Sequence, residues 1–204
     1  TCIAPDYVLV PEDRLDSLVA AAKAVVARLY PALASTTDYS AIVNARHYDR
    51  LAGYAADARS LGATLVPLSN TAADQDSRRM PPVALLGVTD GMRVMQDEIF
   101  GPLLPLVPYR ALDDAIRYVA ARPRPLALYY FGRGERDVER VLRETHSGGV
   151  TINDVILHIA QDDLPFGGVG ASGIGHYHGR DGFLAFSKAK GVFRQARLNG
   201  MGLF

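Results

Sequence analysis

Asp97-Glu98-Ile99-Phe100-Gly101-Pro102 lies near the middle of this 204-residue chain, between two strongly apolar segments. These segments, residues 82–88 and 103–109, lack the alternation of polar and apolar side chains that a half-exposed strand shows. Such runs are typical of parallel strands that are covered on both faces. The Gly-Pro pair stops any helix from continuing into the second segment. The stretch therefore predicts a loop that leads into a buried strand.

Strands and helices alternate on both sides of this loop. The expected helices are residues 12–30, 44–60, 113–121 and 135–146, and the expected strands are 7–11, 63–66, 82–88, 103–109, 126–131 and 150–152. This alternation predicts an α/β fold with an open, twisted, mostly parallel sheet and helices on both faces. Sites in such sheets lie at the carboxyl ends of the strands, which is where Asn153 stands.

Apolar side chains recur at three- and four-residue spacing in the first two helices, which predicts one buried face on each. The first face comprises Leu15, Leu18, Val19, Ala22, Val25, Val26 and Leu29. The second face comprises Tyr48, Leu51, Ala52, Ala55 and Ala58. The prolines within 103–109 suggest that this strand is locally irregular.

The composition excludes some classes of protein. Hydrophobic residues make up 49% of the chain, which is ample for a core, and the formal net charge is zero. That balance argues against a partner nucleic acid or membrane surface, and no apolar run approaches the ~20 residues that span a bilayer. One cysteine and no signal-peptide pattern favour a reducing, cytoplasmic setting. The chain starts Thr1-Cys2-Ile3 without an initiator Met, so we expect a piece of a longer protein.

Glu98 and Phe100 form a pair with a specific chemical use. If the segment is extended, the two side chains point to the same side of the backbone. The carboxylate can then accept hydrogen bonds from hydroxyls while the ring holds a flat group, which suits a sugar joined to a planar heterocycle. Taken alone, the six residues are better explained as an ordinary buried turn with a capping Glu, because short motifs are weak signals.

The glycine-rich segment 164–175 formally matches a dinucleotide fingerprint at Gly168, Gly170 and Gly173. We reject that interpretation, because the fingerprint must follow a strand and needs an acidic residue about 20 positions later. Ser172 is not in a nucleophile elbow either, since Ile174 stands where that motif needs glycine. We expect instead that these glycines let a tight loop pass close to other backbone.

His176-Tyr177-His178 contains two histidines, too few to hold a metal ion without further ligands, and no cluster of Cys or His accompanies them. The sequence therefore predicts no metal site. The tail from Val192 to Phe204 ends in Met201, Leu203 and Phe204. Apolar tails of this kind tend to dock on a neighbour.

Five separated motifs, in order, make the whole chain resemble the catalytic half of the NAD(P)-dependent aldehyde dehydrogenases, closest to the class-3 and coniferyl aldehyde dehydrogenase branch. The motifs are Thr1-Cys2-Ile3-Ala4-Pro5-Asp6-Tyr7-Val8-Leu9, Glu98-Ile99-Phe100-Gly101-Pro102, Pro125-Leu126-Ala127-Leu128-Tyr129, residues 147–155, and residues 164–173 with Tyr177-His178-Gly179. The resemblance implies a catalytic domain over residues 1–186 and an oligomerisation or interdomain arm over 187–204. The family's cofactor-binding domain, general-base Glu and oxyanion Asn would lie upstream of Thr1.

The resemblance also implies roles for individual residues. Cys2 falls on the family's nucleophile, Glu98 on the carboxylate that holds the nicotinamide ribose, and Phe100 on the ring beside the nicotinamide. Ile156, Ile159, Phe166 and His178 fall near the substrate tunnel. The implied cofactor is NAD or NADP, and the implied partners are a small-molecule aldehyde, such as an aromatic aldehyde like coniferaldehyde, and a second copy in a homodimer.

The family's chemistry implies that the thiolate attacks the aldehyde, that hydride leaves the thiohemiacetal for NAD(P)+, and that water releases the acid from the thioester. The backbone N–H of the nucleophile is a natural oxyanion donor. Two alternatives stay open: a relative that passes the thioester to coenzyme A, and a non-catalytic oligomerisation or scaffold fragment. For the dehydrogenase fragment itself, we expect the isolated chain to be folded but inactive, since the cofactor-binding domain is missing.

Overall fold

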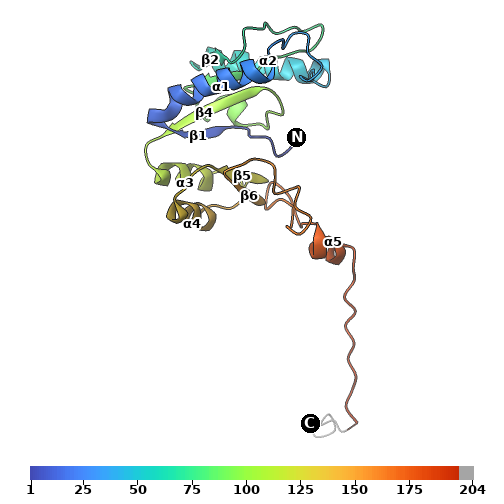
Figure 1. The fold of residues 1–204 in the computed structure, drawn as a ribbon. Helices are drawn as coiled ribbons and strands as arrows, with labels where there is room; N and C mark the ends of the chain where they lie inside the picture. The colour runs from blue at the N-terminus through green and yellow to red at the C-terminus, as the bar shows by residue number, and fades with distance from the viewer. Residues whose placement is uncertain (198–204) are drawn as a thin grey trace. The chain divides into compact units, whose positions relative to one another are not determined.

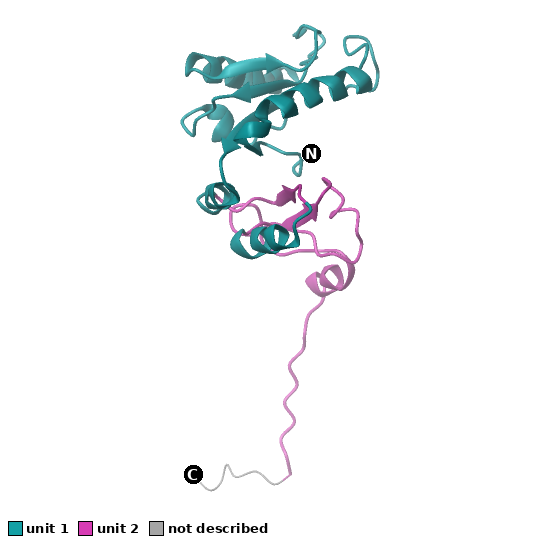
Figure 2. Ribbon diagram, turned by 60° about the vertical axis from the view of Figure 1, so that its left-hand side comes forward, with its two compact units in different colours: residues 1–122, 133–145 teal, residues 123–132, 146–204 magenta. Residues whose placement is uncertain are grey.

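The computed structural model describes residues 1–197, and these fall into two compact units (Figures 1 and 2). Unit 1 comprises residues 1–122 and 133–145, and unit 2 comprises residues 123–132 and the chain from His146 onward. The last helix, α5, spans Gly179–Ala185, and residues 187–197 form no regular element. The apolar residues expected at the end of the arm, Met201, Leu203 and Phe204, lie outside the described residues.

Unit 1 is built on a four-stranded sheet. Its strands, in spatial order, are β1 Val8–Pro11, β4 Leu103–Tyr109, β3 Val83–Leu86 and β2 Thr64–Pro67. Strand β4 pairs in parallel with both β1 and β3, and β2 runs antiparallel at the edge. The α/β class with a mostly parallel sheet is thereby confirmed. The expected irregularity in β4 is not seen, because the strand pairs without a break through Pro105 and Pro108.

Helix α1, Leu15–Leu29, follows a short 3-10 turn at Glu12–Arg14 and covers one face of this sheet (Figure 1). Its side chains pack on Val10, Leu68, Ala84 and Leu106. The covered face is narrower than predicted, since Val25 and Leu29 are exposed. Val25 stands at the margin of the apolar stripe and Leu29 is the last helical residue, so both lie beyond the area that the strands can cover.

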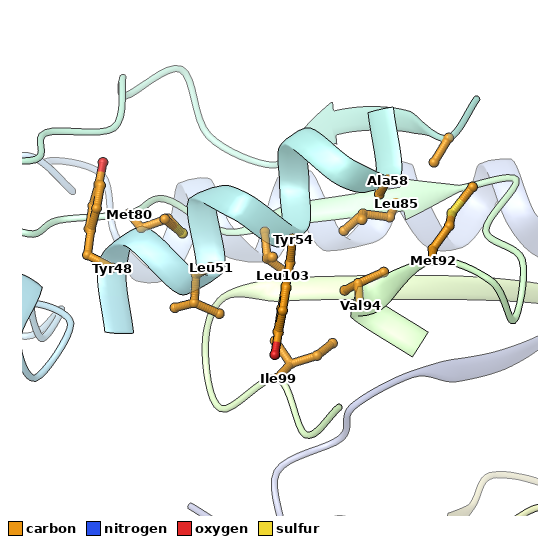
Figure 3. Packing of buried hydrophobic residues seen from close by; sticks show 11 residues of the cluster. Tyr48, Leu51, Tyr54, Ala58, Met80, Leu85, Met92, Val94, Ile99 and Leu103 are labelled. Carbon is orange, nitrogen blue, oxygen red and sulfur yellow. The ribbon is translucent and has the colours of Figure 1, made fainter. Parts of the chain in front are cut away.

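Helix α2, Ala45–Ser60, packs on the other face. Neighbouring residues of a strand point to opposite faces, and Leu85 of β3 lies in the α2 cluster whereas Ala84 lies in the α1 cluster. Figure 3 shows this cluster, which is centred on Leu51 and Tyr54. Tyr54 is buried although the predicted face does not include it, and Ala52 is exposed although the predicted face includes it. The buried stripe thus follows the spacing of Tyr48, Leu51, Tyr54 and Ala58.

The remaining strands do not join the first sheet. Strands β5, Ala127–Tyr130, and β6, Gly149–Ile152, pair in parallel as a two-stranded sheet within unit 2. The chain between them contributes α4, Glu135–Glu144, which belongs to unit 1 together with α3, Leu112–Ala120. One further 3-10 turn spans Arg93–Met95. Within residues 1–197, none of the helices has the length and apolar character needed to cross a membrane.

Leu51 is fully buried between α2 and the sheet, with 0% of its surface exposed. We expect Leu51→Ala to lower the free energy of unfolding by about 2–5 kcal/mol, because the substitution removes buried methyl groups and leaves a cavity. Leu29→Ala is the matched control, since this helical leucine is 55% exposed and should shift the value by no more than ~0.5 kcal/mol. Equal losses in denaturant titrations of the 204-residue chain would contradict this account of the core.

Candidate functional site

Cys2 is presented at the surface by a short turn at the start of unit 1. The N–H of Ala4 donates to the carbonyl oxygen of Thr1 at 3.0 Å, which closes the turn. Ile3 is buried and anchors the turn, whereas the Cys2 side chain is exposed. An exposed thiol next to a buried anchor is accessible to a reactant while its backbone is held in place.

Glu98 and Phe100 are exposed on either side of Ile99, whose exposed fraction is only 1%. Ile99 belongs to the core cluster of α2, so the buried residue fixes the loop that carries the two exposed ones (Figure 3). The expected extended conformation fails at Phe100, which has a φ of 50° and is 56% exposed. A positive φ is uncommon for a bulky residue, so this loop is held in its shape by its surroundings.

The Cys2 turn and the Glu98 loop lie at the same edge of the sheet. The turn precedes β1 and the loop precedes β4, and these two strands are parallel neighbours. Their preceding segments therefore lie at the amino-terminal edge of the sheet. The sequence predicts sites at the carboxyl edge, but that rule concerns loops that follow strands, and both of these segments come before their strands.

Asp6 connects the two segments. Its Oδ1 accepts a hydrogen bond from the N–H of Ile99 at 3.0 Å, and the carboxylate also accepts one from the N–H of Phe100. Burial raises the pKa of Asp6 above its ordinary value, although these two hydrogen bonds and the nearby charge of Arg50 act in the opposite direction. The partly buried carboxylate of Asp6 thus binds the backbone of the Glu98 loop.

Two side chains of α2 also hold this loop, one through its backbone carbonyl oxygens and the other through the side chain of Asp97. Arg50 donates to the carbonyl oxygens of Glu98 at 3.0 Å and Ile99 at 2.6 Å. The Tyr54 hydroxyl donates to Oδ2 of Asp97 at 2.8 Å, and the Arg50 guanidinium lies 5.0 Å from the Tyr54 ring centroid. Sequence reasoning missed both residues. Their spacing of four positions, which places them on one side of a helix, is a signal that could have suggested a joint role.

Gly101 completes the loop for a steric reason. A Cβ atom at this position would lie 2.4 Å from Cδ1 of Leu51. Because Leu51 is packed in the core, it has little freedom to move away. The glycine thus lets the loop descend directly onto α2 before β4 begins.

In unit 2, Asn153 fixes the end of β6. It has a φ of 58°, its Oδ1 accepts from the N–H of Gly132 at 2.9 Å, and its Nδ2 donates to the Gly132 carbonyl at 2.9 Å. Asn is one of the residues that tolerate this backbone conformation. The predicted position at a strand's carboxyl end is correct, and the side chain serves there to join the ends of β5 and β6.

His158 lies in the interior of unit 2, where its exposed fraction is 6%. Its Nδ1 is 2.9 Å from Oγ1 of Thr151, and its ring centroid is 6.0 Å from that of Tyr129 and 5.7 Å from that of Phe166. The Nε2 atom is buried without a hydrogen-bonding partner. Burial in this largely aromatic site lowers the pKa of His158. Sequence reasoning did not single out this residue.

The four residues expected near a substrate tunnel all belong to unit 2. Phe166 is buried, its backbone exchanges two hydrogen bonds of 2.9 Å with Tyr177, and its ring is stacked with that of His178 at 6.1 Å. Ile156, with a φ of 68°, is exposed, and Ile159 is half-buried. The structure therefore brings Phe166 and His178 together, and places the two isoleucines on the loop that contains His158.

The glycine-rich segment forms a tight loop, as predicted. A Cβ on Gly168 would lie 2.1 Å from the carbonyl oxygen of Ser172, and Gly170 forms an isolated bridge with Gly173. The Ser172 hydroxyl is occupied by Val169, accepting from its N–H at 2.9 Å and donating to its carbonyl at 3.2 Å. In this loop the glycines thus let two stretches of backbone pack closely against each other.

The histidines of residues 176–178 have other partners. Nε2 of His176 is 3.2 Å from Oδ1 of Asp181, and Nδ1 of His178 is 3.2 Å from the carbonyl oxygen of Leu164. Among residues 1–197, no three side chains of His, Cys, Asp or Glu gather closely enough to hold a metal ion.

Comparisons with a family model and with individual proteins agree on one family. The model described as "Aldehyde dehydrogenase family" matches residues 1–192. The chain is 60% identical over 199 residues to the "Probable coniferyl aldehyde dehydrogenase" of Pseudomonas aeruginosa, covering 98% of this chain and 41% of that protein. It is 40% identical over 201 residues to "Aldehyde dehydrogenase, dimeric NADP-preferring" of Rattus norvegicus, covering 98% and 43%. The chain therefore spans about two fifths of the length of these relatives.

A solved structure agrees with this result. "Substrate bound state of Staphylococcus Aureus AldH" superposes with a TM-score of 0.82 at 40% identity, covering 98% of this chain and 43% of that one.

The lowered pKa of His158 predicts a pH dependence of stability. A histidine whose pKa is lowered by folding stabilises the fold above its ordinary pKa of 6.5, and this contribution is lost as the pH falls. We expect the free energy of unfolding to drop more steeply in the wild type than in His158→Gln between about pH 7 and pH 5. The four other histidines are common to both proteins and cancel in the comparison. Parallel pH profiles in denaturant titrations would show that burial does not oppose protonation of this ring.

Proposed function

Because this chain belongs to the aldehyde dehydrogenase family, we propose that it is the catalytic-domain portion of an NAD(P)-dependent enzyme that oxidises an aldehyde to its carboxylic acid. The observation that carries the proposal is the pairing at one sheet edge. An exposed cysteine and an exposed Glu-x-Phe loop precede neighbouring parallel strands and are tied together through Asp6.

Cys2 is the nucleophile in this proposal. Its thiolate attacks the carbonyl carbon of the aldehyde and forms a thiohemiacetal, and the backbone N–H of Cys2 donates a hydrogen bond to the oxyanion. Loss of hydride from the same carbon leaves a thioester on the sulfur. Attack of water on the thioester then releases the carboxylic acid and regenerates the thiol.

Glu98 and Phe100 hold the nicotinamide end of the cofactor, NAD or NADP, which supplies the hydride acceptor. The fit is chemical: a carboxylate accepts hydrogen bonds from the two ribose hydroxyls, and an exposed ring on the same rigid loop can lie beside a flat heterocycle. Both side chains are exposed, while the backbone that carries them is bound by Asp6 and Arg50. The NADP preference in the name of the rat relative supports this cofactor class.

The proposed substrates are aromatic aldehydes such as coniferaldehyde, in keeping with the name of the Pseudomonas aeruginosa relative. Ile156 and Ile159 supply apolar contacts, and His178 supplies a polar atom at the tunnel. Phe166 is buried beneath His178, so we assign it the role of supporting that ring. We further propose that the full-length protein is a cytoplasmic homodimer, as the word "dimeric" in the rat relative's name suggests.

Cys2→Ser in the full-length enzyme tests the nucleophile. We expect turnover to disappear while NAD binding stays nearly intact, because an alcohol is a far weaker nucleophile without a base tuned for it. Steady-state assays with coniferaldehyde and a fluorescence titration with NADH measure the two quantities. Retention of more than a few per cent of kcat would remove Cys2 from its assigned role.

Glu98→Gln tests the ribose contact. The neutral amide accepts weaker hydrogen bonds than the carboxylate, and a small displacement of the hydride acceptor can lower the rate about a hundredfold. We expect kcat to fall by tenfold or more on this basis, measured as hydride transfer in a single turnover. Glu139→Gln, the same change at an exposed site on α4, should leave it unaltered. An unchanged single-turnover rate in Glu98→Gln would mean that the cofactor is held elsewhere.

A further inference from the structure

Asp6 is the side chain that joins two segments which are 93 residues apart in sequence. It belongs to the segment that presents Cys2, and it accepts from the N–H groups of Ile99 and Phe100. Pairing of β1 with β4 already brings the two segments to one edge of the sheet. Strand pairing alone does not fix the loop, however, because β4 begins only at Leu103, beyond the Gly-Pro pair.

The loop needs such external contacts. Phe100 has a φ of 50°, in the left-handed region that bulky side chains avoid. Strained backbone of this kind persists only where the surrounding structure over-determines it, and it concentrates at functional sites. Asp6 binds the loop at its N–H groups and Arg50 binds it at two carbonyl oxygens. The strained segment is thus held through both its backbone N–H groups and its carbonyl oxygens.

We propose that Asp6 is a positioning residue, which sets the distance between the Cys2 sulfur and the cofactor end held by Glu98 and Phe100. This inference rests on the function proposed above. Asp6 touches neither reactant, since its carboxylate is occupied by the loop backbone. It acts by keeping the nucleophile and the hydride acceptor in register, and a misplacement of about 1 Å at a reacting centre can lower the rate about a hundredfold.

The first experiment measures the link itself in the 204-residue chain. Hydrogen exchange of the Ile99 and Phe100 amides is compared in the wild type, Asp6→Asn and Asp6→Ala. We expect protection of both amides in the wild type, partial loss in Asp6→Asn, whose amide oxygen can still accept one bond, and full loss in Asp6→Ala. Asp57→Asn is the matched control, because Asp57 accepts from the backbone N–H of Arg93 at 2.9 Å but has no bond to the loop. Unaltered protection in Asp6→Ala would overturn the inference.

The second experiment measures the consequence in the full-length enzyme. We expect Asp6→Asn and Asp6→Ala to lower kcat by tens to hundreds of fold, while the KM for aldehyde and the rate of Cys2 alkylation by iodoacetamide change only a few fold. A residue needed merely for folding would lower only the fraction of protein with a normally reactive Cys2, and the kcat calculated per reactive Cys2 would stay unchanged. An unchanged kcat in Asp6→Ala, in an enzyme whose wild type is active, would overturn this inference alone. A wild type without dehydrogenase activity would instead overturn the proposed function, and this inference with it.

Discussion

Parallel pairing of β1 with β4 is the constraint on which the candidate site depends. The first strand of the chain lies beside a strand that begins near residue 103, so the segments before them meet at one edge although they are far apart in sequence. Every other contribution to the site refines that arrangement. Asp6 bridges the segments, Ile99 anchors the loop in the core, and Gly101 lets the loop pass close to α2.

Helix α2 serves the core and the site at once. Its buried stripe includes Leu51 and Tyr54. The Tyr54 hydroxyl binds the side chain of Asp97 in the loop, and the nearby Arg50 binds the loop backbone. The placement of Tyr54 that buries its ring in the core therefore also positions its hydroxyl to bind the loop. A change that shifts this helix on the sheet would move the Glu98 loop with it, so stability and site geometry are coupled in unit 1.

Much of the fold could be predicted from the sequence, because it rests on local signals. The helices and strands follow from periodicity and from glycine and proline, and their alternation indicates the α/β class. The partition into two sheets and the location of the site segments at the amino edge could not be predicted, since they depend on which strands become neighbours. Tyr54 and Asp6 escaped notice for the same reason. Their partners, Asp97 and the Ile99 amide, are 43 and 93 residues away, and no periodicity encodes such contacts.

The contacts that hold the loop are made largely to backbone atoms. Asp6 binds N–H groups and Arg50 binds carbonyl oxygens, which every residue other than proline provides. The frame therefore does not depend on the side chain displayed at position 98, whereas position 100 is restricted by its positive φ, which β-branched residues avoid. Within that limit, mutational drift or deliberate redesign can exchange those two groups, and with them the ligand proposed for this edge, while the scaffold beneath keeps its shape. Such separation of support from display is what makes a binding surface evolvable.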